Sequence, residues 1–336
     1  MFPKWGRQVG MMDKRTGMAL WGCGRWGEKW LATLLGNDAM ELLYVVDSDS
    51  ARLEQLKQKY PAVTVTNDIG KTLADERVQA VVIAAPVKEH ARLTVQALNA
   101  NRHVLCEKPL CHELDELIAI NQAARKSTGR LMVGHLLAFY PLLAKLRQML
   151  RSGDLGELHG LELRRTALGR VRRVEDVIKS FAVHDLVAAI LLLDAPITSV
   201  NAYGWGLNQD RVEEGHIVLQ TGKVTAHIYA NWLSPYKERR MIVTCENGSA
   251  EFLEDGDGTH LRAWKFAWSQ PQKGEDTIPV VAEPILAEDL KIAALDLELN
   301  GFLRLIQTGE ATEGTDLEFA GLLMTLLDEI GKKIRV

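Results

Sequence analysis

Three glycines near the N-terminus constrain this chain more than any other feature of its sequence. The segment 21–27 reads W-G-C-G-R-W-G and places Gly22, Gly24 and Gly27 at the spacing G-x-G-x-x-G. The first glycine of such a loop permits a tight turn from strand to helix, the second lets a ligand reach bare backbone, and the third lets the helix pack close to the sheet. The apolar run 18–21 precedes the loop and an amphipathic segment follows it. We therefore expect a strand, a turn and a helix whose first N–H groups bind a diphosphate.

An acidic residue follows the loop at the distance that a dinucleotide site requires. Asp47 lies 20 residues after Gly27 and directly follows the apolar run 42–46. A carboxylate there can accept hydrogen bonds from both adenosine ribose hydroxyls and would repel a 2′-phosphate, so the sequence predicts NAD in preference to NADP. Arg52 is close enough in the sequence to leave NADP open as the cofactor. An ordinary glycine-rich turn that binds no cofactor is the alternative interpretation of the loop. The cofactor contacts expected here are Gly22, Cys23, Gly24, Arg25, Trp26, Gly27 and Asp47.

The first part of the chain predicts a sheet covered on both faces. As far as residue 134, short apolar runs without alternation are separated by amphipathic segments of helix length, which is typical of a parallel sheet between helices. We expect a Rossmann domain, a doubly wound parallel sheet, over 1–134, with 1–16 as a polar lead-in. The expected strands are 18–22, 41–46, 63–65, 79–85, 103–106 and 130–134, and the expected helices are 25–36, 49–59, 88–99 and 112–127.

The pattern changes after residue 135, where pairs of apolar segments flank turns. T-G-K at 221–223 and N-G at 247–248 each separate two such segments, and Asn-Gly is the strongest short signal of a hairpin. We expect an α+β domain over 135–336 with a large, mostly antiparallel open sheet, whose apolar face is covered by helices or by a second subunit. Its expected strand pairs are 215–220 with 224–232 and 241–246 with 249–253, and its expected helices are 141–151, 181–193, 287–307 and 315–330.

Composition excludes several classes of partner. The net charge of −4 gives no field that would recruit nucleic acid. The longest apolar run, 186–193, is far shorter than the roughly 20 residues of a membrane span. The four cysteines show neither a C-x-x-C pair nor the spacing of a zinc site, so we expect free thiols, a cytoplasmic protein and no metal.

Two segments that end strands of the first domain carry further chemistry. Ala85 and Pro86 end one strand and are followed by His90, while Glu107 and Lys108 end the next. Both segments fall at the carboxyl edge of a doubly wound sheet, where ligands bind, so we expect all five residues to contact the cofactor. The Lys108 ammonium can also stabilise the alkoxide that forms as a hydride leaves a substrate. Taken alone, a surface Lys-Pro turn would be the simpler interpretation.

The second domain offers a histidine and a group of arginines. His184 opens an apolar helix and is a natural general base for a secondary alcohol, although a core histidine bonded to a carbonyl is the simpler interpretation in isolation. Arginine forks suit phosphate or carboxylate, and a solvated loop paired with acidic neighbours is an equally good interpretation. The arginines are Arg164, Arg165, Arg170, Arg172 and Arg173.

Together these segments resemble the Gfo/Idh/MocA family of NAD(P)-dependent oxidoreductases from about Met18 to the C-terminus. The resemblance rests on the glycine loop, Asp47, A-A-P at 84–86 with His90, E-K-P at 107–109, V-G-H at 133–135 with F-Y-P at 139–141, and H-D at 184–185. Within the family, L-G-R-V-R at 168–172 and N-W-L-S-P-Y-K at 231–237 look most like the UDP-N-acetylglucosamine and UDP-glucuronate type of 3-dehydrogenase.

The resemblance implies roles for individual residues. Lys108 would touch both substrate and nicotinamide, His184 would be the acid/base, and the second domain would pack into homodimers or homotetramers through its sheet. The family usually has an aspartate four residues before this histidine, where this chain has Ser180. Loss of that carboxylate should weaken His184 as a base and fix its tautomer less well. The expected substrate contacts are His135, Tyr140, Arg164, Arg172, Ser180 and His184.

The leading hypothesis is an NAD-dependent dehydrogenase that moves a hydride between nicotinamide and a secondary alcohol of a sugar, either nucleotide-linked or acidic. The absence of an aspartate at position 180 leaves a second hypothesis, a non-catalytic NAD sensor that binds a protein partner. A redox glycosidase or a non-sugar reductase of the same family is the third. The sequence does not choose the sugar or the carbon that is oxidised.

Overall fold

The computed structural model describes residues 15–169, 171, 175–207, 211–268, 279–281, 284–291 and 293–334. The chain divides into two compact units, of which one comprises Met1–Gly134 with Leu295–Ala320 and the other comprises His135–Ala294 with Gly321–Val336. Residues 295–320, which the sequence analysis assigned to the second domain, therefore pack with the first unit. Hydrogen bonds hold them there, because Val133 N–H donates to the carbonyl of Thr315 at 2.8 Å and the Arg130 guanidinium donates to the carbonyl of Ile306 at 3.1 Å.

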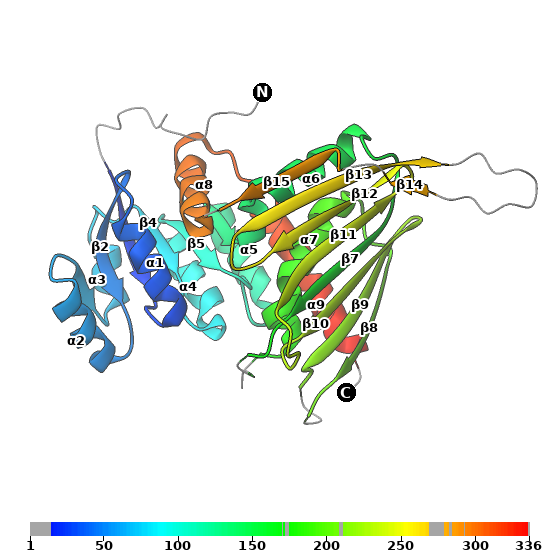
Figure 1. The fold of residues 1–336 in the computed structure, drawn as a ribbon. Helices are drawn as coiled ribbons and strands as arrows, with labels where there is room; N and C mark the ends of the chain where they lie inside the picture. The colour runs from blue at the N-terminus through cyan, green and yellow to red at the C-terminus, as the bar shows by residue number, and fades with distance from the viewer. Residues whose placement is uncertain are drawn as a thin grey trace, which may run out of the picture. The chain divides into compact units, whose positions relative to one another are not determined.

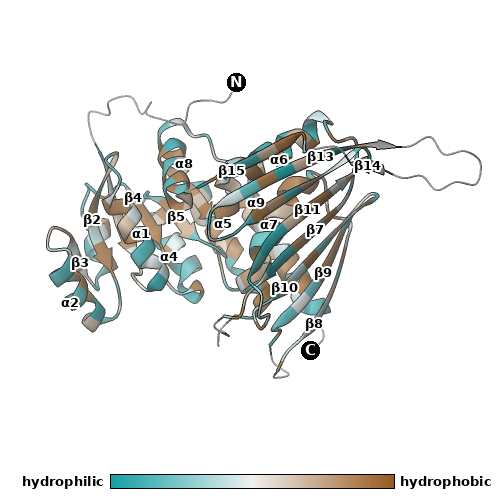
Figure 2. Ribbon diagram, in the orientation of Figure 1, coloured by the Kyte–Doolittle hydropathy of each residue, from teal (hydrophilic) through white to brown (hydrophobic). Residues whose placement is uncertain are grey.

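The first unit contains a parallel six-stranded sheet in the order β3-β2-β1-β4-β5-β6, which confirms the expected Rossmann topology (Figure 1). Every residue of β1 and of β4 is buried, as the unalternating apolar runs predicted. Figure 2 shows these inner strands in the brown of hydrophobic residues. The strands are β1 (Thr16–Trp21), β2 (Met40–Val46), β3 (Thr64–Thr66), β4 (Ala80–Ile83), β5 (His103–Glu107) and β6 (Leu131–Gly134).

Four helices of this unit follow the strands as the sequence predicted, and α3 and α8 are additions to it. The short helix α3 was missed, because six residues are too few to show a helical period. Asp49 caps α2 by accepting from the N–H groups of Ala51 and Arg52, whereas α1 begins after Gly24 without a side-chain cap. The helices are α1 (Arg25–Leu35), α2 (Ser50–Lys59), α3 (Ile69–Ala74), α4 (Val87–Asn99), α5 (Glu116–Lys126) and α8 (Ala294–Thr308).

The second unit contains a nine-stranded sheet in the order β14-β13-β12-β11-β7-β10-β9-β8, with β15 paired to β13. All of its pairs are antiparallel except that of β7 with β10, so the expected mostly antiparallel sheet is confirmed. The strands are β7 (Leu158–Thr166), β8 (Ser199–Trp205), β9 (Glu214–Thr221), β10 (Val224–Asn231), β11 (Glu238–Cys245), β12 (Gly248–Glu254), β13 (Thr259–Trp268), β14 (Pro279–Val281) and β15 (Leu286–Leu290).

Helices cover one face of this sheet (Figure 1). They are η1 (Leu136–Phe139), α6 (Pro141–Ser152), η2 (Ile178–Ala182), α7 (Val183–Leu193) and α9 (Leu317–Lys333), which begins in the first unit. The expected helix 287–307 is wrong in its first third. Residues 286–290 form β15, because they pair with β13, and the helix α8 begins only at Ala294.

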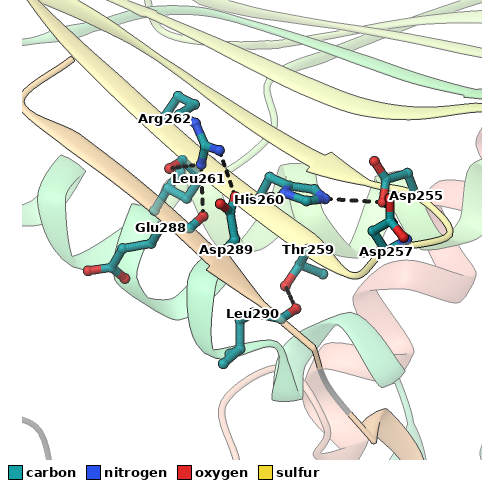
Figure 3. A network of polar contacts seen from close by, with 9 residues as sticks. All are labelled: Asp255, Asp257, Thr259, His260, Leu261, Arg262, Glu288, Asp289 and Leu290. Carbon is teal, nitrogen blue, oxygen red and sulfur yellow. Dashed lines mark hydrogen bonds and ion pairs between the residues drawn. The ribbon is translucent and has the colours of Figure 1, made fainter. Parts of the chain in front are cut away.

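Polar side chains fasten β15 to β13 (Figure 3). The His260 ring has its Nδ1 2.7 Å from an Asp289 carboxylate oxygen and its Nε2 3.1 Å from an Asp255 oxygen. Arg262 donates to the same Asp289 carboxylate at 2.6 Å, and the hydroxyl of Thr259 donates to the carbonyl of Leu290 at 3.2 Å. Hydrogen bonds from Asp289 and Asp255 raise the pKa of His260, and His260 lowers the pKa values of both carboxyl groups in return.

These shifts predict that the contact between β15 and β13 depends on pH. A histidine whose pKa is raised stabilises the fold fully below its ordinary value near 6.5 and loses that contribution as the pH rises through its raised pKa. Amide hydrogen exchange in β15 should therefore become faster on the alkaline side relative to the rest of the sheet. NMR should give a titration midpoint of His260 above 6.5, and Asp289→Asn should lower it.

Asp257→Asn is the matched control for this experiment, because the Asp257 side chain lies in the same turn and only its backbone N–H contacts Asp255. The control should leave the midpoint of His260 near its wild-type value. A wild-type midpoint at or below 6.5 would contradict the ion-paired arrangement.

Candidate active site

The glycine loop joins β1 to α1 at the carboxyl edge of the six-stranded sheet. Gly22 has φ +89°, and a Cβ atom on it would lie 2.6 Å from the backbone of Ala85. A Cβ atom on Gly27 would lie 2.2 Å from the carbonyl oxygen of Gly22, whereas one on Gly24 would meet nothing within 4 Å. The first and third glycines are therefore required by packing, and the second leaves the backbone open on its outer side, as the spacing predicted.

Asp47 and Arg52 both hold the backbone of Cys23. Asp47 accepts a hydrogen bond from Cys23 N–H at 2.7 Å, and Arg52 Nε donates to the Cys23 carbonyl at 3.0 Å. Arg52 also pairs with Glu28 at 2.7 Å. The carboxylate thus lies beside the loop, as expected, and the nearby arginine already has an acidic partner.

Glu107, at the end of β5, is buried and accepts hydrogen bonds from α1. One of its oxygens accepts from the indole N–H of Trp26 and from that of Trp30, the latter at 2.7 Å. Its other oxygen accepts from the backbone N–H of Lys108 at 3.3 Å. Burial raises the pKa of Glu107, while the indoles and Lys108 favour its charged form. The sequence analysis expected Trp26 to contact the cofactor, and in the structure its indole binds Glu107. The sequence analysis did not single out Trp30 for this role.

A second buried carboxyl group comes from α8. Glu298 is 1% exposed, and neither of its side-chain oxygens has a hydrogen-bond partner among the described residues. One of them packs so close to Gly134 that a Cβ atom there would lie 2.7 Å away. Burial and the charge of Glu107 raise the pKa of Glu298 well above its ordinary value. Since Glu107 receives the N–H donors and Glu298 receives none, the proton of this pair belongs on Glu298.

The remaining expected residues of the first unit gather at the same edge. His90 is buried, with one ring nitrogen 2.8 Å from the carbonyl oxygen of Ala85 and the other 2.7 Å from that of Pro109. Pro86 is exposed and precedes α4, while Lys108 is partly exposed after β5. The structure therefore brings together the glycine loop, the acid after β2 and the segments after β4 and β5.

The second unit carries His184 on α7, the helix that follows the π-turn η2. At the end of η2 the N–H of Val183 bonds to the carbonyl of Ile178, five residues back, so this segment is wider than an α-helix. Ser180 is buried and His184 is half-buried. His135 and Tyr140, which flank η1, are also buried, and the Tyr140 ring centroid lies 6.4 Å from that of Phe252.

The expected arginine cluster divides between the two faces of the sheet. Arg165 is buried and makes two hydrogen bonds, of 2.8 and 3.1 Å, to the carboxylate of Asp185 on α7. Its neighbour Arg164 points to the opposite face because side chains alternate along a strand, and it pairs with Glu238 at 3.1 Å. The structure therefore does not bring Arg164 to the face that α7 covers. Arg170, Arg172 and Arg173 lie outside the described residues.

The four cysteines are buried free thiols, as expected. Burial raises the pKa to about 11 for Cys23 and Cys245 and to about 12 for Cys111. In the described part of the chain, no group of three or more His, Cys, Asp or Glu side chains is placed to hold a metal ion. No helix of that part is long and apolar enough to cross a membrane.

Comparison with known proteins identifies the family. Residues 16–135 match the description "Oxidoreductase family, NAD-binding Rossmann fold", and residues 143–251 match "GFO/IDH/MocA C-terminal domain". The chain belongs to the Gfo/Idh/MocA oxidoreductase family. Its first unit is accordingly an NAD(P)-binding Rossmann domain, and its second unit carries the C-terminal domain of the family.

Individual curated relatives share only part of their sequence with this chain. Inositol 2-dehydrogenase of Rhodococcus erythropolis is 33% identical over 217 residues, which cover 61% of this chain and 62% of the relative. The chain spans 44% to 62% of the length of the first four curated relatives that it matches.

Two solved structures share the fold over nearly the whole chain. UDP-N-acetylglucosamine 3-dehydrogenase GnnA of Acidithiobacillus ferrooxidans has a TM-score of 0.77 at 21% identity, over 96% of this chain and 98% of that one. Aldose-aldose oxidoreductase of Caulobacter crescentus has a TM-score of 0.79 at 18% identity, over 95% and 97%.

The buried carboxyl of Glu298 predicts an unusual pH dependence of stability. An acid whose pKa is raised on folding binds a proton in the native state that the unfolded chain releases above pH 4.5. The free energy of unfolding should therefore fall as the pH rises above this value, with a slope of at most about 1.4 kcal/mol per pH unit. Glu298→Gln cannot ionise and should remove this pH dependence. In urea unfolding, the free energy of unfolding of the variant should therefore increase relative to that of the wild type as the pH rises.

Glu310→Gln, an exposed change in the same unit, is the control and should follow the wild type at every pH. Parallel pH profiles of Glu298→Gln and the wild type would show that Glu298 is charged in the folded protein.

Proposed function

We propose that this protein is an NAD-dependent dehydrogenase that acts on a ring secondary alcohol of a sugar, either nucleotide-linked or acidic. The observation that carries this proposal is the position of Lys108. Its backbone is bonded to Glu107, whose carboxylate is bonded to two tryptophans of the helix that begins at the glycine loop. The backbone that carries the Lys108 ammonium group is thereby held at the edge of the sheet where ligands of such folds bind.

The residues of the first unit fit a dinucleotide. The open side of Gly24 and the uncapped start of α1 offer N–H groups to a diphosphate. Asp47 offers a carboxylate to the ribose hydroxyls, and its neighbour Arg52 is paired with Glu28, which makes it a poorer site for a 2′-phosphate. The nicotinamide ring, when bound, accepts or returns the hydride.

Lys108 and His184 have complementary roles in this proposal. The ammonium of Lys108 donates a hydrogen bond to the reacting oxygen and stabilises negative charge on it. The imidazole of His184 removes or returns the hydroxyl proton. The substrate class is supported by the names of similar proteins, which refer to inositol, to a UDP-sugar and to aldoses.

The residue at position 180 favours a second candidate, a non-catalytic NAD sensor. Ser180 brings no negative charge to fix the tautomer of His184. Binding of NAD without turnover of any sugar, together with a stable protein partner, would favour this candidate.

The two candidates predict different results in an assay of NADH formation with NAD and a panel of UDP-sugars, uronates, inositols and free sugars. For the dehydrogenase, Lys108→Ala should lower kcat by about 10²–10³-fold, the usual cost of removing one donor to a developing oxyanion. Ser180→Asp should raise kcat if the missing carboxylate limits His184. Lys88→Ala, an exposed lysine on α4, is the control and should keep wild-type turnover. Full activity of Lys108→Ala would refute the proposed mechanism.

The cofactor preference can be tested at Asp47. Asp47→Ser removes the carboxylate that would accept from the ribose hydroxyls and repel a 2′-phosphate, and charge-assisted hydrogen bonds of this kind contribute about 1.5–3 kcal/mol. The ratio of the Kd values for NADP and NAD should therefore fall by about 10–100-fold, as measured by calorimetry. Asp49→Ser is the control, because the Asp49 side chain caps α2 and only the backbone N–H of this residue bonds to Asp47. An unchanged ratio in Asp47→Ser would contradict the assignment of Asp47 to the ribose.

A further inference from the structure

One histidine in the first unit spans the ends of two neighbouring strands. His90 lies in α4, and its ring nitrogens are 2.7 Å from the carbonyl oxygen of Pro109 and 2.8 Å from that of Ala85. Ala85 follows β4, and Pro109 follows β5 directly after Lys108. The side chain is 2% exposed, so water does not compete for either nitrogen.

The two partners of His90 determine its protonation state. A backbone carbonyl oxygen can only accept a hydrogen bond, and a neutral imidazole has a single N–H to donate. A neutral ring would therefore leave one nitrogen lone pair facing a carbonyl oxygen at 2.7 or 2.8 Å in a site without water. Only the imidazolium form donates to both oxygens.

The surroundings of His90 are compatible with a buried positive charge. Burial alone would lower its pKa, but electrostatic and hydrogen-bonding interactions with Cys106 and hydrogen bonds to the carbonyls of Pro109 and Ala85 outweigh this effect and raise the pKa to about 9. Glu107 on the same strand interacts electrostatically with His90. The other packed elements add little, since β4 has no titratable residue and the titratable residues of α5, Glu116, Arg125 and Lys126, lie at its two ends.

We propose that His90 is a charged clamp at neutral pH, an imidazolium whose two N–H groups tie the segment after β4 to the segment after β5 and thereby position Lys108. Lys108 is then held on both sides, since its own N–H donates to Glu107 and the next carbonyl, that of Pro109, accepts from His90. His90 acts through the backbone and is a positioning residue, not a catalytic one. This inference rests on the function proposed for Lys108.

The same unit contains a second histidine, His103, which we expect to be neutral and which serves as an internal reference. Nδ1 of His103 accepts a hydrogen bond from the backbone N–H of Arg130 at 3.1 Å and so carries no proton. Burial, together with the nearby charge of Arg130, lowers the pKa of His103. His90 and His103 should therefore be found in different protonation states at neutral pH.

The charge can be tested by ¹⁵N NMR of the full-length protein labelled at histidine, with His90→Gln and His103→Gln used to assign the signals. At pH 7 both ring nitrogens of His90 should have the shifts of an imidazolium and should titrate near pH 9, while His103 should be neutral. A single protonated nitrogen on His90 at pH 7 would overturn the proposal. This measurement needs no turnover, so it stands even if the proposed dehydrogenase activity is absent.

The positioning role can be tested with His90→Gln, which removes the charge and cannot place two donors as the ring does. Amide hydrogen exchange at Lys108 and Leu110 should become faster, and kcat should fall by about 10–100-fold, the cost of a small misplacement of a reacting group. The wild type should lose kcat as the pH rises through about 9, the pKa of His90, and the variant should lack this step. His103→Gln is the control and should keep the wild-type kcat and exchange at both positions. Unchanged exchange and kcat in His90→Gln would overturn the clamp even if the ring is charged.

Discussion

The rest of the site depends on the hydrogen bonds that the carboxylate of Glu107 accepts. A buried carboxylate is stable only with several donors, and this one has the indole N–H groups of Trp26 and Trp30 and the backbone N–H of Lys108. Trp26 and Trp30 belong to the helix that begins at the glycine loop, while Lys108 follows β5. One side chain thus fixes the segment proposed to bind a diphosphate relative to the segment proposed to touch the reacting atoms, and the order of the strands alone would not do so.

The charges around Glu107 are balanced within the unit. The positive charge of His90 favours the ionised form of the Glu107 carboxylate, whereas the nearby Glu298 keeps its proton. Glu298 comes from α8, almost two hundred residues later in the chain, and belongs to the segment 295–320 that packs with the Rossmann unit. Among the described residues, the carboxylate of Glu107 therefore lies in the field of the positive charge proposed for His90. A second ionised carboxylate there would have no donor among the described residues.

The sequence predicted those parts of the structure that are set by local rules. Glycine spacing, unalternating strands and Asn-Gly turns located β1, the loop, α1 and the hairpin of β11 with β12, because each depends on neighbouring residues. It did not predict contacts between distant segments, such as Glu107 with Trp30, Glu298 with Gly134, or Arg165 with Asp185. The helix expected from 287 was wrong because pairing with β13, a tertiary interaction, selects a strand for 286–290.

The buried ion pair between Arg165 and Asp185 in the second unit affects the orientation of His184. Asp185 is bound by Arg165 of β7, and an ion pair buried to this degree resists rotation of the helix that carries it, because a broken pair leaves an unpaired charge. His184 is the preceding residue, about 100° away around the helix, so the pair fixes the direction in which His184 points without touching it. In the proposed mechanism, a carboxylate at position 180 would orient His184 and stabilise its protonated form. Orientation by the buried pair can therefore replace the first of these two tasks. The other task, stabilising the protonated imidazole, has no such substitute in Ser180, because a hydroxyl group carries no charge.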